Sequence, residues 1–129
     1  MTKQDVDTFE KLQAQLGGLH TEISALSKKS QNDPLNKFKL KFVNQILSEA
    51  NQLLGEKYKP FNDFSLFNEE DMPTNSDAAM MLTQYLNCFE KLRSDNIQRQ
   101  KEYPHNWCWL VDGKLSNIRT VTPQIIKEK

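Results

Sequence analysis

The sequence predicts a mainly α fold: a three-helix bundle-like domain followed by a C-terminal β-hairpin. Three segments, about 3–28, 34–54 and 75–101, repeat apolar residues at steps of three and four, which is the spacing of one helix face. The chain then changes over about 106–121, where β-favouring residues flank Asp112-Gly113, a type I′ turn signal. We therefore expect residues 1–129 to form a single α-helical domain.

Residues 34–54 carry the strongest helix signal. Asp33 is suited to cap a helix, Pro34 fits the first helical position, and Gly55 supplies the left-handed residue that commonly ends one. The apolar stripe between them predicts a buried face made of Leu35, Phe38, Phe42, Ile46, Ala50 and Leu53, widened by Val43, Leu47 and Leu54. Over 37–42 lysines alternate with apolar residues at strand spacing, but the helical period covers more of the segment and favours a helix.

The first segment, 3–28, shows the a/d spacing of a coiled-coil seam. Its members are Phe9, Leu12, Leu16, Leu19, Ile23 and Leu26. Gly17 and Gly18 interrupt the seam and together cost about 2 kcal/mol in helix propensity. The glycines predict either a bend in the helix or a neighbouring backbone packed close against them. The pattern leaves open whether the seam packs inside the chain or across a dimer.

The third helix is expected to start at a capping box formed by Thr74 and Asp77. It should end near Lys101, because Pro104 disfavours helix at the residue before it.

Residues 56–73 form an aromatic loop that contains Tyr58, Phe61, Phe64 and Phe67. Aromatic rings mainly serve core packing, so we expect them to cover the helices. The alternative is an aromatic binding groove, for which Phe61 and Phe64 are the candidate contact residues.

The C-terminal hairpin brings two tryptophans together. Pairing through the Asp-Gly turn sets Trp109 opposite Ser116 and Trp107 opposite Ile118. Trp107, Trp109 and Ile118 then share one face, which must pack on the helices or on a partner because an isolated hairpin is marginal in water. Trp107 and Trp109 are therefore candidate binding residues.

Composition argues against several classes of function. Seventeen basic residues balance seventeen acidic ones, which makes nucleic-acid binding unlikely. No apolar run approaches the roughly 20 residues of a membrane span, and no N-terminal signal pattern is present. Cys88 and Cys108 stand alone, as expected for free thiols in a reducing compartment, and the alternative is a single disulfide between them. These features predict a cytoplasmic protein without a membrane segment.

Only two residues suggest a catalytic site. Arg99 precedes His105 by six positions, a spacing similar to the arginine–histidine pair of HEPN-type ribonucleases, which are small all-helical proteins. The resemblance implies an arginine that stabilises a phosphate transition state and a histidine that transfers protons. Pro104, inside the interval, departs from that motif. No metal-ligand or phosphate-binding loop motif is present, and no cofactor is expected.

The function predicted from these observations is that of a non-enzymatic interaction or regulatory module, which binds a protein partner or pairs as a homodimer through the first helix, the hairpin or both. One alternative is a small nuclease or phosphoryl enzyme that uses Arg99 and His105. The other is nucleic-acid binding through the lysines of the Lys28–Lys41 region, with tryptophan stacking.

Overall fold

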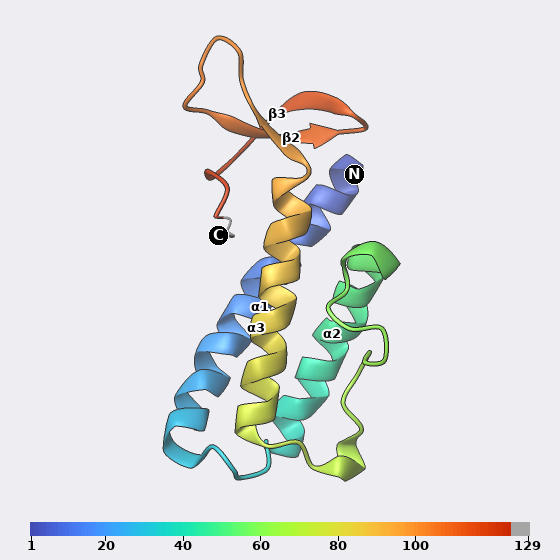
Figure 1. Ribbon diagram of the computed structural model, residues 1–129, viewed down its shortest axis with the longest axis vertical. Coiled ribbons are helices and arrows are strands. Elements are labelled where there is room, and N and C mark those ends of the chain that lie inside the picture. The colour runs from blue at the N-terminus through green and yellow to red at the C-terminus, as the bar shows by residue number, and fades with distance from the viewer. Residues whose placement is uncertain (125–129) are drawn as a thin grey trace.

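The computed structural model describes residues 1–124, and it shows three long helices and a three-stranded antiparallel sheet (Figure 1). The helices are α1 (Lys3–Ser30), α2 (Lys37–Tyr58) and α3 (Asn75–Ser94), with a short 3₁₀ helix η1 (Glu69–Asp71) before α3. The strands β1 (Ile97–Arg99), β2 (Trp107–Val111) and β3 (Lys114–Thr120) lie in the order β1-β2-β3. The predicted mainly α fold with a C-terminal hairpin is confirmed. Residues 125–129, the end of the predicted domain, lie outside the described residues.

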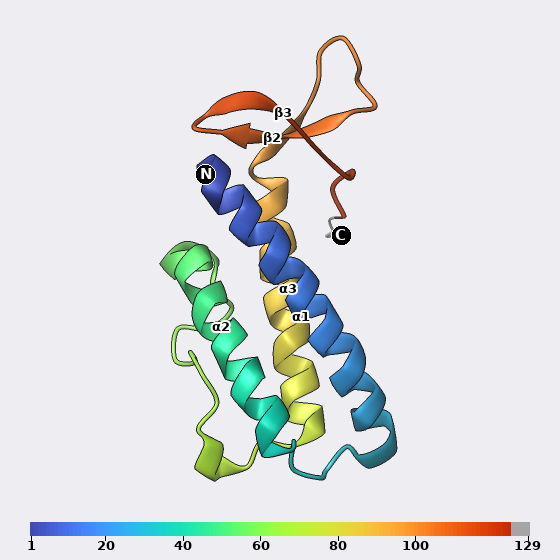
Figure 2. The ribbon, with the colours of Figure 1, turned by 180° about the vertical axis from the view of Figure 1, so that it is seen from behind.

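The core lies among α1, α2 and α3 and extends to the sheet, which covers the end of the bundle where α1 begins (Figures 1 and 2). Phe9 of α1 stacks on Phe89 of α3 and meets Trp109 of β2 edge to face, each at a centroid distance of 5.0 Å. The seam residues Phe9, Leu12, Leu16 and Ile23 are fully buried. The a/d seam of α1 therefore packs inside the chain.

Gly17 and Gly18 do not interrupt α1. The helix runs through both of them, and a Cβ atom added to either would meet no atom within 4 Å. The expectation of a neighbouring backbone packed close against these glycines is therefore wrong.

Helix α2 begins at Lys37, one turn later than predicted. Asn36, rather than Asp33, caps it by accepting a hydrogen bond from the Lys39 backbone N–H at 2.9 Å. The preceding residues are extended, because the Leu35 N–H donates to the Pro73 carbonyl at 2.8 Å. Pairing with the segment that enters α3 thus overrides the helix-start signal. At the other end Gly55 adopts φ +65° as predicted, and a last turn continues to Tyr58.

Helix α3 has the predicted capping box at Thr74 and Asp77, but it ends at Ser94 instead of Lys101. The sequence analysis did not predict β1, which occupies part of the last two turns expected for α3. Strand β1 pairs with β2 and sets Ile97 opposite Trp109, both of them buried. The cross-strand packing that stabilises this short strand is not visible in the local sequence.

The hairpin turn forms as predicted, with positive φ at both residues of the Asp-Gly turn, but the register differs. An irregularity between Cys108 and Leu110 places Trp107 opposite Thr120 instead of Ile118. The Ser116 hydroxyl donates to the Trp109 carbonyl at 2.7 Å and accepts from the Ile118 N–H at 3.0 Å. This side chain satisfies backbone groups that the irregular ladder leaves unpaired.

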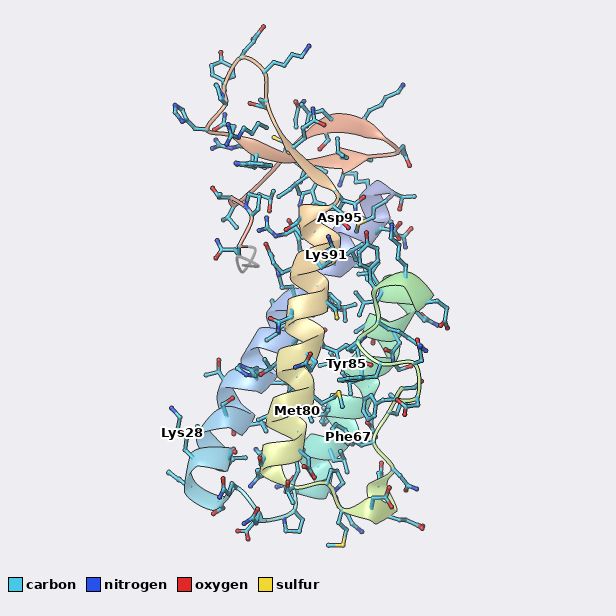
Figure 3. All side chains as sticks on the ribbon, in the orientation of Figure 1. Lys28, Phe67, Met80, Tyr85, Lys91 and Asp95 are labelled. Carbon is cyan, nitrogen blue, oxygen red and sulfur yellow. The ribbon has the colours of Figure 1, made fainter. Side chains whose placement is uncertain are left out.

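The segment between α2 and α3 packs its rings against the helices. Phe64 meets Phe67 edge to face at 5.1 Å and Tyr85 of α3 at 6.5 Å. Two hydrogen bonds of 3.0 Å join Asn44 of α2 to Phe67: the Phe67 N–H donates to Asn44 Oδ1, and Asn44 Nδ2 donates to the Phe67 carbonyl. Figure 3 shows Tyr85 and Phe67 on the side of α3 that faces α2. Phe64 and Phe67 therefore pack against the helices, as the first of the two interpretations predicted.

Candidate interaction surface

Two phenylalanine rings lie on the outer face of α2, near its start. Phe38 is 70% exposed and Phe42 is 37% exposed. The rings meet edge to face at a centroid distance of 5.0 Å, as side chains four residues apart on a helix can. We call Phe38 and Phe42 the phenylalanine pair.

The exposure of this pair corrects the predicted buried face of α2 at Phe38 and Phe42, whereas Val43, Leu47, Ala50 and Leu54 are buried as predicted. The buried residues of the helix are Leu40, Val43, Leu47, Ala50 and Leu54. At about 100° per residue, Phe38 lies on the side of the helix opposite Leu40 and Leu47. The apolar residues of α2 cover one broad arc of the helix, and only the packing of α2 on the other helices decides which part of that arc is buried. The missed signal was the lysines around Phe38 and Phe42, which are typical of a solvated helix face.

The lysines of the Lys28–Lys41 region do not form one surface. Lys39 makes an ion pair with Glu22 of α1, with 3.2 Å between Nζ and Oε2. Lys28, near the end of α1, points away from α2 (Figure 3). Lys37 and Lys41 remain beside the phenylalanine pair, and within residues 1–124 neither forms an ion pair. Lys41 also places its ammonium 5.6 Å from the centroid of the Phe42 ring.

A mainly apolar groove of about 240 Å³ adjoins these lysines. Leu35, Leu40 and Met72 contribute to its lining, together with Lys37 and Glu69. Met72 is 57% exposed and has φ +50°, a left-handed conformation that is uncommon for a residue other than glycine. We define the α2 surface as the phenylalanine pair, Lys37, Lys41 and this groove.

The four predicted binding residues lie at two other places. Trp109 is fully buried, and its indole N–H donates to Glu10 of α1 at 3.3 Å, so this side chain serves the core. Trp107, in the same strand, is half-buried. Phe64 packs beside Tyr85 in the middle of α3, and Phe61 is 39% exposed in the same aromatic loop. None of the four belongs to the α2 surface.

Arg99 and His105 both lie on the surface, at the start and the end of the connection between β1 and β2. The Arg99 guanidinium lies over the Trp107 ring at 5.4 Å, a cation–π contact between residues paired across the two strands. Among the described residues no hydrogen bond joins Arg99 to His105.

Three further features bear on function: metal-ligand clusters, the state of the cysteines and membrane-spanning helices. Residues 1–124 contain no group of three or more His, Cys, Asp or Glu side chains placed to hold a metal ion. Cys88 and Cys108 are free thiols, and burial raises the pKa of Cys88 above its ordinary value. None of the helices over these residues is both long enough and apolar enough to cross a membrane.

Comparison with protein-family models, with curated proteins and with solved structures finds no match for this chain.

Proposed function

We propose that this protein is a non-enzymatic interaction module that binds another protein through the α2 surface. The observation that carries the proposal is the phenylalanine pair, in which one ring is 70% exposed although it contacts the other. Single apolar side chains on a surface are ordinary, whereas grouped ones beside a groove mark binding surfaces. Fully burying a phenylalanine contributes about 1.5–3 kcal/mol, so a partner that covers both rings gains substantial affinity.

The phenylalanine pair does not contribute to the hydrophobic core, which supports a role in binding. The buried core contains neither Phe38 nor Phe42, and the other side of α2 supplies the packing. Aromatic residues that contribute little to the fold and lie together on a helix are typical anchors of protein interfaces. The two free cysteines support the cytoplasm as the compartment in which the module works.

The test compares the proteins captured by three forms of the purified chain from a lysate of its source cells. The forms are the wild type, the double variant Phe38→Ser/Phe42→Ser, and the control Met80→Ser, which removes a 51% exposed side chain from α3. We expect a protein that the wild type and Met80→Ser retain and that the double variant loses. Equal capture by all three forms, or no specific capture by any, contradicts the proposal. Circular dichroism and urea unfolding should show that both variants keep the fold.

A further inference from the structure

We infer that the partner segment bound at the α2 surface is acidic, with carboxylates placed between two apolar anchors. One anchor covers the phenylalanine pair, and the other enters the groove lined by Leu40 and Met72. This inference rests on the proposed function and specifies the chemistry of the partner.

Lys37 and Lys41 connect the two apolar parts of the surface. Lys37 lines the groove, and Lys41, one helical turn later, lies over the Phe42 ring. A bound segment that reaches from the groove to the phenylalanine pair therefore passes the two ammonium groups. Carboxylates at that point of the segment would meet both charges.

Both lysines are available to an incoming carboxylate. The neighbouring Lys39 already has Glu22 as its partner, whereas Lys37 and Lys41 have no ion-pair partner within residues 1–124. The start of α2 adds to the positive potential, because backbone N–H groups of a first turn carry partial positive charge. Unlike α1 and α3, which have Asp5 and Asp77 in their first turns, α2 has no acidic residue there.

The same charges disfavour other occupants. A second copy docked through this surface would bring the Lys37 and Lys41 side chains of both copies together, and like charges in contact suppress such pairing. Glu69 in the groove lining and Glu22 beside Lys39 interrupt the positive surface, which opposes the continuous negative charge of a nucleic-acid backbone or an anionic membrane. The inferred segment places an apolar side chain, not a carboxylate, beside Glu69. A concave apolar groove instead suits a side chain of a protein segment.

The experiment selects random peptides displayed on phage against the immobilised full chain. The selected peptides are then measured by fluorescence anisotropy against four variants. Phe38→Ser/Phe42→Ser removes the aromatic anchor, Lys37→Gln/Lys41→Gln removes the two charges, and Lys37→Glu/Lys41→Glu inverts them. Lys28→Gln/Lys29→Gln is the matched control, because it removes two exposed lysines from the end of α1.

We expect enriched peptides with Asp or Glu between apolar residues. Lys37→Gln/Lys41→Gln should raise their Kd about tenfold, as two surface ion pairs do, and added salt should weaken binding. The control should leave Kd unchanged, and Lys37→Glu/Lys41→Glu should select basic peptides instead.

Two failures are distinguishable. If selected peptides do not require Phe38 and Phe42, the proposed function fails. If they require both rings but lack acidic residues, or bind the Lys37→Gln/Lys41→Gln variant equally well, the inference about the partner fails while the proposed function stands.

Single-stranded RNA and phosphatidylserine vesicles serve as competing probes. Tighter binding of either through Lys37 and Lys41 than of any peptide overturns an acidic protein segment as the partner.

Discussion

The Arg93 guanidinium and the Glu90 carboxylate form a two-bond ion pair on α3, with 2.9 Å between Nε and Oε1 and 2.8 Å between Nη2 and Oε2. The pair also holds the chain where it leaves β3. Arg93 donates to the Thr120 hydroxyl and to the carbonyls of Val121 and Thr122 at 2.7–2.9 Å. Arg93 is only 2% exposed, and this network explains how its charge is buried.

Arg93→Ala should destabilise the protein by about 3–5 kcal/mol, because it removes the positive partner of the Glu90 carboxylate and the donor to the carbonyls of Val121 and Thr122. The measurement is urea unfolding, and Lys91→Ala on the exposed side of the same helix is the control. The control should change stability by less than about 0.5 kcal/mol. A similarly small effect of Arg93→Ala would mean that the network does not stabilise the fold.

Gly17→Ala and Gly18→Ala should each stabilise the protein by up to about 1 kcal/mol. Both glycines lie inside α1, where alanine has the higher helix propensity, and an added Cβ meets no atom within 4 Å. Gly55→Ala is the opposite control, because φ at Gly55 is +65° and an L-residue there costs about 1–2 kcal/mol. Urea unfolding of the three variants should therefore show opposite signs. Destabilisation by Gly17→Ala would contradict the open surroundings of this position.

The Tyr58 hydroxyl donates to the Asp95 carboxylate at 2.6 Å, and this bond contributes to the pKa shifts of both groups. The pKa of Tyr58 is raised from 10.0 to about 12, first by this bond and then by burial and the Asp95 charge. The same bond is the largest cause that lowers the pKa of Asp95 below 3.8. The Tyr58 contribution to stability is present below pH 10 and is lost as the pH rises towards 12. The Asp95 contribution is present above pH 3.8 and is lost as the pH falls below that value.

Ultraviolet titration of tyrosinate tests this bond. In Asp95→Asn the pKa of Tyr58 should return towards 10.0, because the carboxylate is gone. Tyr58→Phe identifies which titration step belongs to Tyr58. The raised pKa of Tyr85, caused first by burial, should not change in Asp95→Asn. An unchanged late step in Asp95→Asn would show that another group raises the pKa of Tyr58.

His105→Ala should leave the fold intact and change no nuclease activity, because the side chain is exposed and forms no hydrogen bond with Arg99 among the described residues. The assay incubates wild type and variant with RNA and with DNA. Robust cleavage by the wild type that disappears in the variant would favour the nuclease alternative over the interaction module.

Self-association remains a prediction, and light scattering over a range of micromolar concentrations measures it. The seam of α1 packs inside the chain, so a homodimer would have to use the hairpin region, where Tyr103 and Leu115 are 62% and 38% exposed. We expect a mass of twice 15.0 kDa that Leu115→Ser lowers. A constant mass of 15.0 kDa would exclude the homodimer at these concentrations.

Features that depend only on neighbours along the chain could be predicted from the sequence. The capping box at Thr74, the left-handed Gly55 and the Asp-Gly turn follow from local backbone chemistry, and each lies where the sequence places it. The α1 seam was also visible, because one regular stripe runs along the helix and four of its members are fully buried.

Tertiary structure decided what local signals left open. Helix α2 has one broad apolar arc, and packing on its neighbours buries Leu40 and Leu47 at one side of it while Phe38 at the other side remains exposed. Residues 97–99 form a strand only because β2 lies beside them, and the first turn expected at Pro34 is replaced by pairing with the segment before α3. The physical reason is common to all three cases: burial and cross-strand pairing depend on residues distant in sequence, and their free energies exceed local propensities of less than about 1 kcal/mol.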